Sequence, residues 1–228
     1  MEGTYDLRTI IALDSLKSNK DKITSLVERT CGLVAGYKLG WPNLIGTSPP
    51  KIVEAIKRPC PEKLLVVDLK LADIYYTMKT ILDEFPDSID AVIAHAFVGR
   101  RNALEELKHY LDMRDIRLVL VASMSHPGSK DVIDPCKDKI LGTTRQIKPW
   151  GVVAPATRPE NIRIMRRELG PGIKILSPGI GAQGAEPGDA LRAGADYEII
   201  GRMITTSPDP VQVLNKIIAR HKSILNEY

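Results

Sequence analysis

Short apolar segments alternate with amphipathic segments along the chain. The apolar segments are rich in β-branched residues and are apolar at almost every position, which is typical of strands buried on both faces of a parallel sheet. In the segments between them apolar residues recur at helical spacing, as where Ile23, Leu26 and Val27 share one helical face. The pattern predicts strands at residues 8–13, 33–39, 64–69, 91–96, 117–121, 151–153, 173–176 and 197–200.

The number and spacing of these strands indicate a closed barrel. Eight βα units of roughly 25 to 30 residues fill the 228-residue chain and leave no segment for a second domain. This arrangement fits a closed barrel better than an open doubly wound sheet. We therefore predict one α/β domain over residues 1–228, a (β/α)8 TIM barrel.

Composition and charge narrow the classes of function. The chain is 43% hydrophobic and 26% charged, so it can bury a large core, and its net charge of +4 comes from scattered Lys and Arg residues. No apolar stretch approaches the ~18 residues of a membrane span, and the first residues, with Glu2 and Asp6, do not resemble a targeting segment. We expect a cytoplasmic protein that binds neither nucleic acid nor membrane.

The cysteines are predicted to be reduced. Cys31, Cys60 and Cys136 have no metal-ligand spacing, and three cysteines cannot all pair within one chain. A framework of disulfides is therefore not expected, and the three residues are interpreted as structural.

The run from Val66 to Ile74 carries the sharpest chemical signal. In a barrel, catalytic residues lie where strands end and βα loops begin. Strand side chains alternate between faces, so Asp68 and Lys70 point the same way as Val66, toward the barrel axis. Lys38 ends the neighbouring strand and Asp73 follows in the loop, which predicts an alternating array of Lys38, Asp68, Lys70 and Asp73. Buried charges without partners are costly, so such an array indicates function.

A phosphate site is predicted at the last two strands. The stretch 177–184 is rich in glycine and follows the seventh strand, while Gly201 and Arg202 follow the eighth. Loops at these positions often bind phosphate in this fold. Glycine lets backbone N–H groups approach an oxyanion, and arginine adds a planar guanidinium that can donate two parallel hydrogen bonds.

Other polar residues at strand ends are less specific. Ser125 is suited to hydrogen-bond a polar ring, whereas His126 is interpreted equally well as a loop-packing residue, and His95 as a core histidine with satisfied hydrogen bonds. Apolar residues at neighbouring strand ends, Ile93, Val121 and Val153, would suit a dry pocket or plain barrel core. No Ser/His/Asp set and no clustered metal ligands are recognisable in the sequence.

Several motifs together resemble one enzyme family. They are Asp-x-Lys-x-x-Asp-Ile at 68–74, Met-Ser-His-Pro-Gly at 124–128, Ala-Pro-Ala-Thr-Arg-Pro-Glu at 154–160, Ser-Pro-Gly-Ile-Gly-Ala-Gln-Gly at 177–184 and Ile-Gly-Arg at 200–202. In order and spacing they resemble the orotidine 5'-monophosphate decarboxylases, most closely their short archaeal form, from about Thr9 to the C-terminus. Family members often have proline straight after Asp-Ile, where this chain has Tyr75 and Tyr76.

The resemblance implies a (β/α)8 homodimer that converts orotidine 5'-monophosphate to uridine 5'-monophosphate and carbon dioxide, a step of pyrimidine biosynthesis, without cofactor or metal. Lys70 would protonate pyrimidine C6, and Asp68 would lie near the substrate carboxylate. The resemblance implies further positions as well. These are Asp73 and Thr77 reaching the neighbouring subunit's site, Asp14 and Lys38 at the ribose, Ser125 at the base, Gln183 and Arg202 at the phosphate, with Pro178 and Gly201 also contacting substrate.

Two alternatives remain open. A related barrel with the same Asp-x-Lys-x-x-Asp motif could use magnesium to stabilise an enediolate, as in decarboxylases and aldolases of keto-sugar phosphates. Activity that survives a chelator would exclude it. A non-catalytic barrel that binds a nucleotide or a protein partner would show a broken charge array, whereas here the array is complete.

Overall fold

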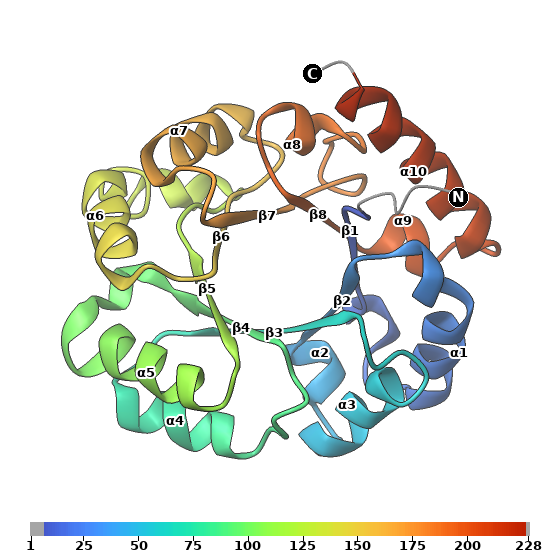
Figure 1. Ribbon diagram of the computed structural model, residues 1–228, viewed down its shortest axis with the longest axis horizontal. Coiled ribbons are helices and arrows are strands. Elements are labelled where there is room, and N and C mark those ends of the chain that lie inside the picture. Colours follow the sequence, from blue (N-terminus) through green and yellow to red (C-terminus); the bar gives the residue numbers. More distant parts are fainter. Residues whose placement is uncertain (1–6, 227–228) are drawn as a thin grey trace.

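The computed structural model of the chain describes residues 7–226. In this part of the chain eight parallel strands close into a barrel in sequence order, with β8 paired to β1 (Figure 1). The predicted (β/α)8 TIM barrel is therefore confirmed, and each predicted strand is present. The strands are β1 (Thr9–Ala12), β2 (Gly36–Gly40), β3 (Leu64–Leu71), β4 (Ala91–His95), β5 (Arg117–Val121), β6 (Gly151–Val153), β7 (Lys174–Pro178) and β8 (Tyr197–Ile200).

The helices form a ring around the barrel (Figure 1). No helix of the described part is long and apolar enough to cross a membrane. The α-helices are α1 (Lys20–Thr30), α2 (Trp41–Leu44), α3 (Pro49–Lys57), α4 (Tyr75–Asp83), α5 (Glu105–Met113), α6 (Lys137–Ile147), α7 (Pro159–Leu169), α8 (Asp189–Arg192), α9 (Arg202–Thr205) and α10 (Pro210–Leu225). The structure also contains short turns of other helix types, which are η1 (Asp14–Leu16), η2 (Cys31–Leu33), η3 (Ala96–Val98), η4 (Arg100–Leu104) and η5 (Pro127–Lys130).

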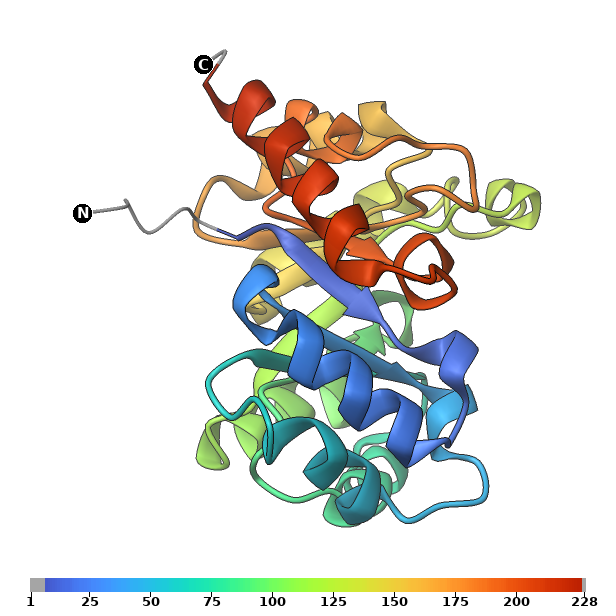
Figure 2. The same cartoon turned by 90° about the vertical axis from the view of Figure 1, so that its right-hand side faces the viewer.

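Helix α10 completes the ring of helices. Its N-cap residue Asp209 accepts a hydrogen bond from the backbone N–H of Gln212, which satisfies one of the free donors of the first turn. The helix packs against α1 and α8, so the last helix covers the junction of β1 and β8 from outside (Figure 2).

Strand side chains divide between two cores. Val67 and Leu69 belong to the large core between strands and helices, while Val66 belongs to a smaller core inside the barrel. This division explains why the strands are apolar at nearly every position, since both faces are buried. The inner core also contains Ile10, Ala91, Ile93, Val119, Val121, Val153, Leu176 and Ile199.

The prediction that the cysteines are reduced is wrong for two of the three. Cys31 and Cys60 form a disulfide with a Cα–Cα distance of 5.9 Å, and Cys136 is free. Helices α1 and α3 pack side by side, so the two residues just beyond their last turns meet although they lie 29 positions apart in sequence. Sequence spacing carries no information about that contact.

The disulfide is expected to stabilise the fold. Closing a loop of this length restricts the unfolded chain, so Cys31→Ser should lower the free energy of unfolding by about 3–4 kcal/mol under non-reducing conditions. Urea unfolding followed by circular dichroism measures this difference. Cys136→Ser is the matched control, because it removes a thiol without opening a loop. A wild-type protein whose unfolding midpoint is unchanged by a reductant would contradict the prediction.

Candidate active site at the carboxyl ends of the strands

Two adjoining cavities of about 480 and 230 Å³ open at the carboxyl ends of the strands. The larger extends toward the loops after β1, β7 and β8, and the smaller toward the ends of β4, β5 and β6. Both are lined by the residues that lie between them, namely Lys38, Asp68, Lys70, Pro178, Gln183 and Ile199.

A continuous array of opposite charges crosses these cavities. Lys38 Nζ lies 2.9 Å from Asp14 Oδ2 and 3.2 Å from Asp68 Oδ2. Lys70 Nζ donates to both oxygens of Asp68, at 2.9 and 2.8 Å. The register of parallel strands explains the contact of the first pair, because Lys38 of β2 and Asp68 of β3 both stand at the carboxyl edge. The structure brings Lys38, Asp68 and Lys70 into contact, and Asp14 extends the array.

The charges differ in exposure. The side chains of Lys38 and Asp68 are only 8% and 9% exposed, whereas that of Lys70 is 44% exposed and faces the open cavity. Burial alone would raise the pKa of Asp68, but the ammonium groups of Lys38 and Lys70 outweigh burial and hold this pKa below its ordinary value. Burial alone would lower the pKa of Lys38, but Asp68 and Asp14 raise it. At neutral pH the buried pair of Lys38 and Asp68 is therefore ionised, and Lys70 is the more exposed of the two lysines.

The backbone around Lys70 departs from regular strand geometry. The register between β3 and β4 shifts between Val67 and Leu71, and Lys70 has φ of 46°, in the left-handed region. The predicted alternation of strand side chains therefore ends within β3. Positive φ is costly for a residue other than glycine, and bulges that re-aim a side chain are frequent next to active sites. No residue type in the sequence indicates this feature, because lysine has no preference for such a conformation.

Gly40 is a site residue that the sequence reasoning missed. A Cβ at this position would lie 2.0 Å from Asp14 Oδ1 and 3.3 Å from Lys38 Nζ. The absence of a side chain at the end of β2 thus leaves the space in which Asp14 and Lys38 pair. A glycine after a strand is usually a turn signal, so only the contact geometry identifies this one.

His95 was interpreted from sequence as a core histidine with satisfied hydrogen bonds; it is buried as expected, but the expectation about its hydrogen bonds is wrong. The side chain is buried, but its Nδ1 has no hydrogen-bond partner among residues 7–226. Its ring lies 4.7 Å from that of Phe97. Burial lowers the pKa of His95, the charge of Lys70 lowers it further, and Asp68 opposes both effects. His95 is therefore a neutral imidazole close to the charge array.

The loops after β7 and β8 border the larger cavity. Gln183 and Arg202 are exposed and line it, and Pro178, Gly179 and Gly201 line it with them. Gly179 has φ of 105°, which a residue with a side chain adopts only with strain, and its backbone stands beside Gln183. Arg202 forms no ion pair with any residue in the described range. This end of the cavity thus combines the Arg202 guanidinium with the backbone of two glycines, a combination that suits an oxyanion.

The smaller cavity has an apolar wall. Ile93, Val121 and Val153 line it from β4, β5 and β6 and also belong to the inner core, so the interpretation as barrel core is confirmed and the dry pocket stays a prediction. Ser125 is exposed at its rim. The neighbouring His126 is not among the residues lining either cavity, and its carbonyl accepts a hydrogen bond from Arg158, consistent with a loop-packing role.

Asp73 and Thr77 lie apart from this array in the described part of the chain. Asp73 is exposed, its Oδ1 accepts a hydrogen bond of 2.7 Å from the backbone N–H of Ile74, and it lines neither cavity. Thr77 lies in the first turn of α4. Within one chain, the array therefore runs from Asp14 through Lys38 and Asp68 to Lys70, and Asp73 does not extend it beyond Lys70.

Among residues 7–226 the one grouping of potential metal ligands is Cys31, Cys60 and Glu62. Two of its three members are joined in the disulfide. None of the three lines either cavity at the carboxyl ends of the strands.

Comparison with known proteins finds one family over most of the chain. Residues 8–217 match the family described as Orotidine 5'-phosphate decarboxylase / HUMPS family. The chain is 50% identical over 212 residues to orotidine 5'-phosphate decarboxylase of Aeropyrum pernix, covering 92% of this chain and 86% of that protein. It is 39% identical to the Pyrococcus furiosus enzyme of the same name, covering 93% and 97%.

Solved structures show the same likeness. Orotidine 5'-monophosphate decarboxylase from Metallosphaera sedula superposes with a TM-score of 0.82 at 39% identity, over 96% of this chain and 99% of that one. The enzyme from Methanocaldococcus jannaschii complexed with inhibitor BMP superposes with a TM-score of 0.85 at 29% identity, over 94% and 98%.

Proposed function

The chain belongs to the orotidine 5'-phosphate decarboxylase / HUMPS family, and from that premise we propose that it converts orotidine 5'-monophosphate to uridine 5'-monophosphate and carbon dioxide. This carboxy-lyase reaction is a step of pyrimidine biosynthesis. The observation that carries the proposal is the array of Asp14, Lys38, Asp68 and Lys70, which crosses a cavity that ends at Arg202.

The array supplies the chemistry of the reacting carbon. Asp68 stands beside the position of the substrate carboxylate, and Lys70 faces pyrimidine C6. When the bond from C6 to the carboxylate breaks, the electron pair stays on C6, where the ring offers no electron sink. The preorganised ammonium of Lys70 stabilises that charge and then transfers a proton from Nζ to C6. The resulting neutral amine regains its proton from solvent. Protein side chains supply each of these steps, so the proposed mechanism uses no cofactor and no metal.

The remaining site residues position the nucleotide. Asp14 and Lys38 bind the ribose, and Ser125 contacts the base at the rim of the smaller cavity. The apolar wall of that cavity gives the departing carbon dioxide a dry pocket. Pro178 and Gly201 line the path between base and phosphate.

Gly40→Ala tests the ribose end of the array. A methyl group there would displace the Asp14 carboxylate from Lys38, and loss of one charge-assisted hydrogen bond should lower kcat/KM about 10- to 100-fold. Steady-state kinetics measure the loss. Gly142→Ala on α6 is the matched control, because a Cβ there would meet nothing within 4 Å. A kcat/KM within twofold of wild type for Gly40→Ala would show that the pairing of Asp14 with Lys38 is not needed.

Arg202→Ala tests the phosphate end. We expect the Kd for uridine 5'-monophosphate to rise about 10- to 100-fold, because the guanidinium forms charge-assisted hydrogen bonds to the phosphate. Turnover should fall as well, since phosphate binding energy helps to assemble the closed site. Calorimetry with the nucleotide and with phosphate-free uridine measures the difference, with Arg167→Ala on the exposed face of α7 as control. Equal losses for both ligands would show that Arg202 is not the phosphate clamp.

We further propose a homodimer in which Asp73 and Thr77 enter the neighbouring subunit's site. The segment that carries them exposes large apolar side chains, with Ile74 52% and Tyr76 74% exposed, and Phe97 after β4 is 54% exposed. Exposed apolar side chains gathered near one end of a barrel favour contact with another protein surface. The tyrosines at 75 and 76, where family members often have proline, would then lie at the interface.

A decarboxylation assay tests the proposed function. Purified protein treated with a chelator should consume orotidine 5'-monophosphate, followed by loss of absorbance, with one carbon dioxide released for each uridine 5'-monophosphate formed. A protein inactive on this substrate at every concentration of added magnesium would refute the proposal. Activity that appears only when magnesium is added would favour the magnesium-dependent alternative.

A further inference from the structure

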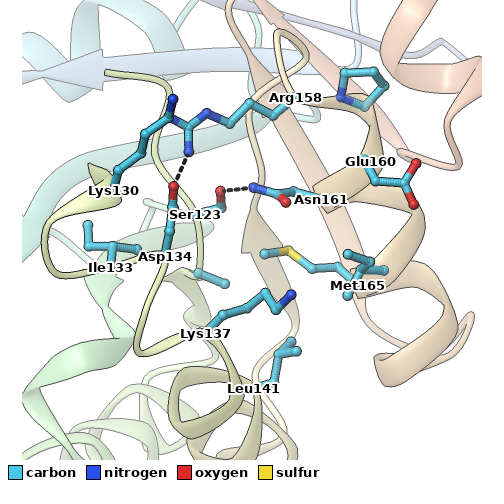
Figure 3. Close-up of a pocket in the computed structure, with 13 residues that line it drawn as sticks. Ser123, Lys130, Ile133, Asp134, Lys137, Leu141, Arg158, Glu160, Asn161 and Met165 are labelled. Atoms are coloured by element: carbon cyan, nitrogen blue, oxygen red, sulfur yellow. Dashed lines mark hydrogen bonds and ion pairs between the residues drawn. The ribbon is translucent and has the colours of Figure 1, made fainter. Parts of the chain in front are cut away.

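A separate cavity of about 420 Å³ lies between α6 and α7, outside the barrel wall (Figure 3). Its volume is in the range of about 300–1,000 Å³ that small-molecule sites occupy. Ser123 is the one described residue that lines both this cavity and the smaller active-site cavity. The end of β5 therefore separates two compartments.

One side of the cavity is apolar. Ile133 and Leu141 contribute from the segment after β5 and from α6, and Ile164 and Met165 contribute from α7. Ile133 and Ile164 are partly exposed there, so apolar surface remains available to a ligand.

The polar side is held in place by hydrogen bonds. Arg158 Nη1 lies 2.7 Å from Asp134 Oδ2, and its Nη2 donates to the carbonyl of His126. Asn161 Nδ2 donates to Ser123 Oγ at 2.9 Å (Figure 3). These contacts connect the loop after β5 to the start of α7, so the shape of the cavity does not depend on a ligand.

The charges around the cavity leave a positive excess. Arg158 and Asp134 neutralise each other, and the rim residue Glu160 pairs with Arg163 at 3.0 Å. Lys130 and Lys137 form no ion pair with any residue between 7 and 226, and Lys137 extends from α6 toward α7 (Figure 3). Helix α7 also begins at the rim, which adds the partial positive charge of a helix N-terminus.

We propose that this cavity is a second ligand site, which binds a small organic anion with an apolar body. The anionic group, a phosphomonoester or a carboxylate, lies beside Lys137, and the apolar body packs on Ile133 and Ile164. The proposal goes beyond the decarboxylase function, because this cavity is separate from the proposed active site. Ser123 is the single described residue that borders both cavities.

Methionine methyl groups give a site-resolved test. In protein labelled with 13C at the methionine methyls, Met165 reports on this cavity, and Met124 and Met203 report on the active site and the segment beside Arg202. Phenyl phosphate and benzoate are the anionic probes, and phenol and inorganic phosphate are controls for the apolar and anionic parts. We expect the Met165 signal to shift and saturate with at least one anionic probe, at lower concentration than with either control. The two anionic probes also show which anionic group the site prefers.

Paired variants test the role of the lysines. Lys137→Gln should weaken the binding seen at Met165 about tenfold or more, because it removes one charged donor. Lys139→Gln, two residues along α6 and exposed, should leave it unchanged. The proposal is overturned if phenol binds as well as the anions, if Lys137→Gln has no effect, or if only Met124 and Met203 respond. The last outcome would leave the proposed decarboxylase site intact.

Discussion

Lys70→Ala is expected to lower kcat for decarboxylation by about 10⁴-fold or more, since it removes the group proposed both to donate the proton and to stabilise charge on C6. Nucleotide binding should persist, because the residues proposed to contact the phosphate and the base lie on other loops. The Kd for uridine 5'-monophosphate should therefore stay within about tenfold of the wild-type value. The variant should also fold, since the Lys70 side chain is 44% exposed and Asp68 keeps Lys38 as a partner.

Single-turnover assays with orotidine 5'-monophosphate, together with calorimetry for the product, measure these two effects separately. Lys20→Ala is a suitable control, because this exposed lysine begins α1 and lines neither active-site cavity. Turnover of Lys70→Ala within tenfold of wild type would rule out Lys70 as the proton donor.

Mixing two inactive variants should restore activity if sites are shared across a dimer. Lys70→Ala and Asp73→Asn homodimers should each be nearly inactive. In a mixed dimer the site on the Asp73→Asn chain keeps its own Lys70 and receives an intact Asp73 from the Lys70→Ala chain, while the other site carries both changes. Random exchange makes half of the dimers mixed, so activity should recover to roughly a quarter of wild type for a two-fold symmetric dimer.

Subunit exchange is verified by native mass spectrometry of chains that carry tags of different mass. Each variant exchanged with itself is the control. Activity that stays near zero after verified exchange would place Asp73 outside the neighbouring subunit's site and refute the shared-site model. The exposed position of Asp73 in one chain, apart from Lys70, is what makes the experiment decisive.

The barrel and the centre of the site were predictable from sequence. Hydrophobic periodicity is a local property, and strands buried on both faces appear in the sequence as short runs that are apolar at almost every position. Adjacent parallel strands place their carboxyl ends at one edge, so the proximity of Lys38 and Asp68 follows from their positions at the ends of neighbouring strands. The glycine-rich stretch and Arg202 were likewise expected at one end of a cavity, because β7 and β8 are neighbours.

Only the tertiary structure decided two kinds of feature. One is contacts that depend on how distant segments pack, and the other is backbone geometry that no particular residue type favours. The pairing of Cys31 with Cys60 follows from how α1 lies against α3, and the bulge that ends at Leu71 follows from the pairing of β3 with β4. Gly40 is important because of the Asp14 side chain that occupies its space. In each case the deciding quantity is a distance between atoms far apart in sequence, which packing determines and which no local pattern records.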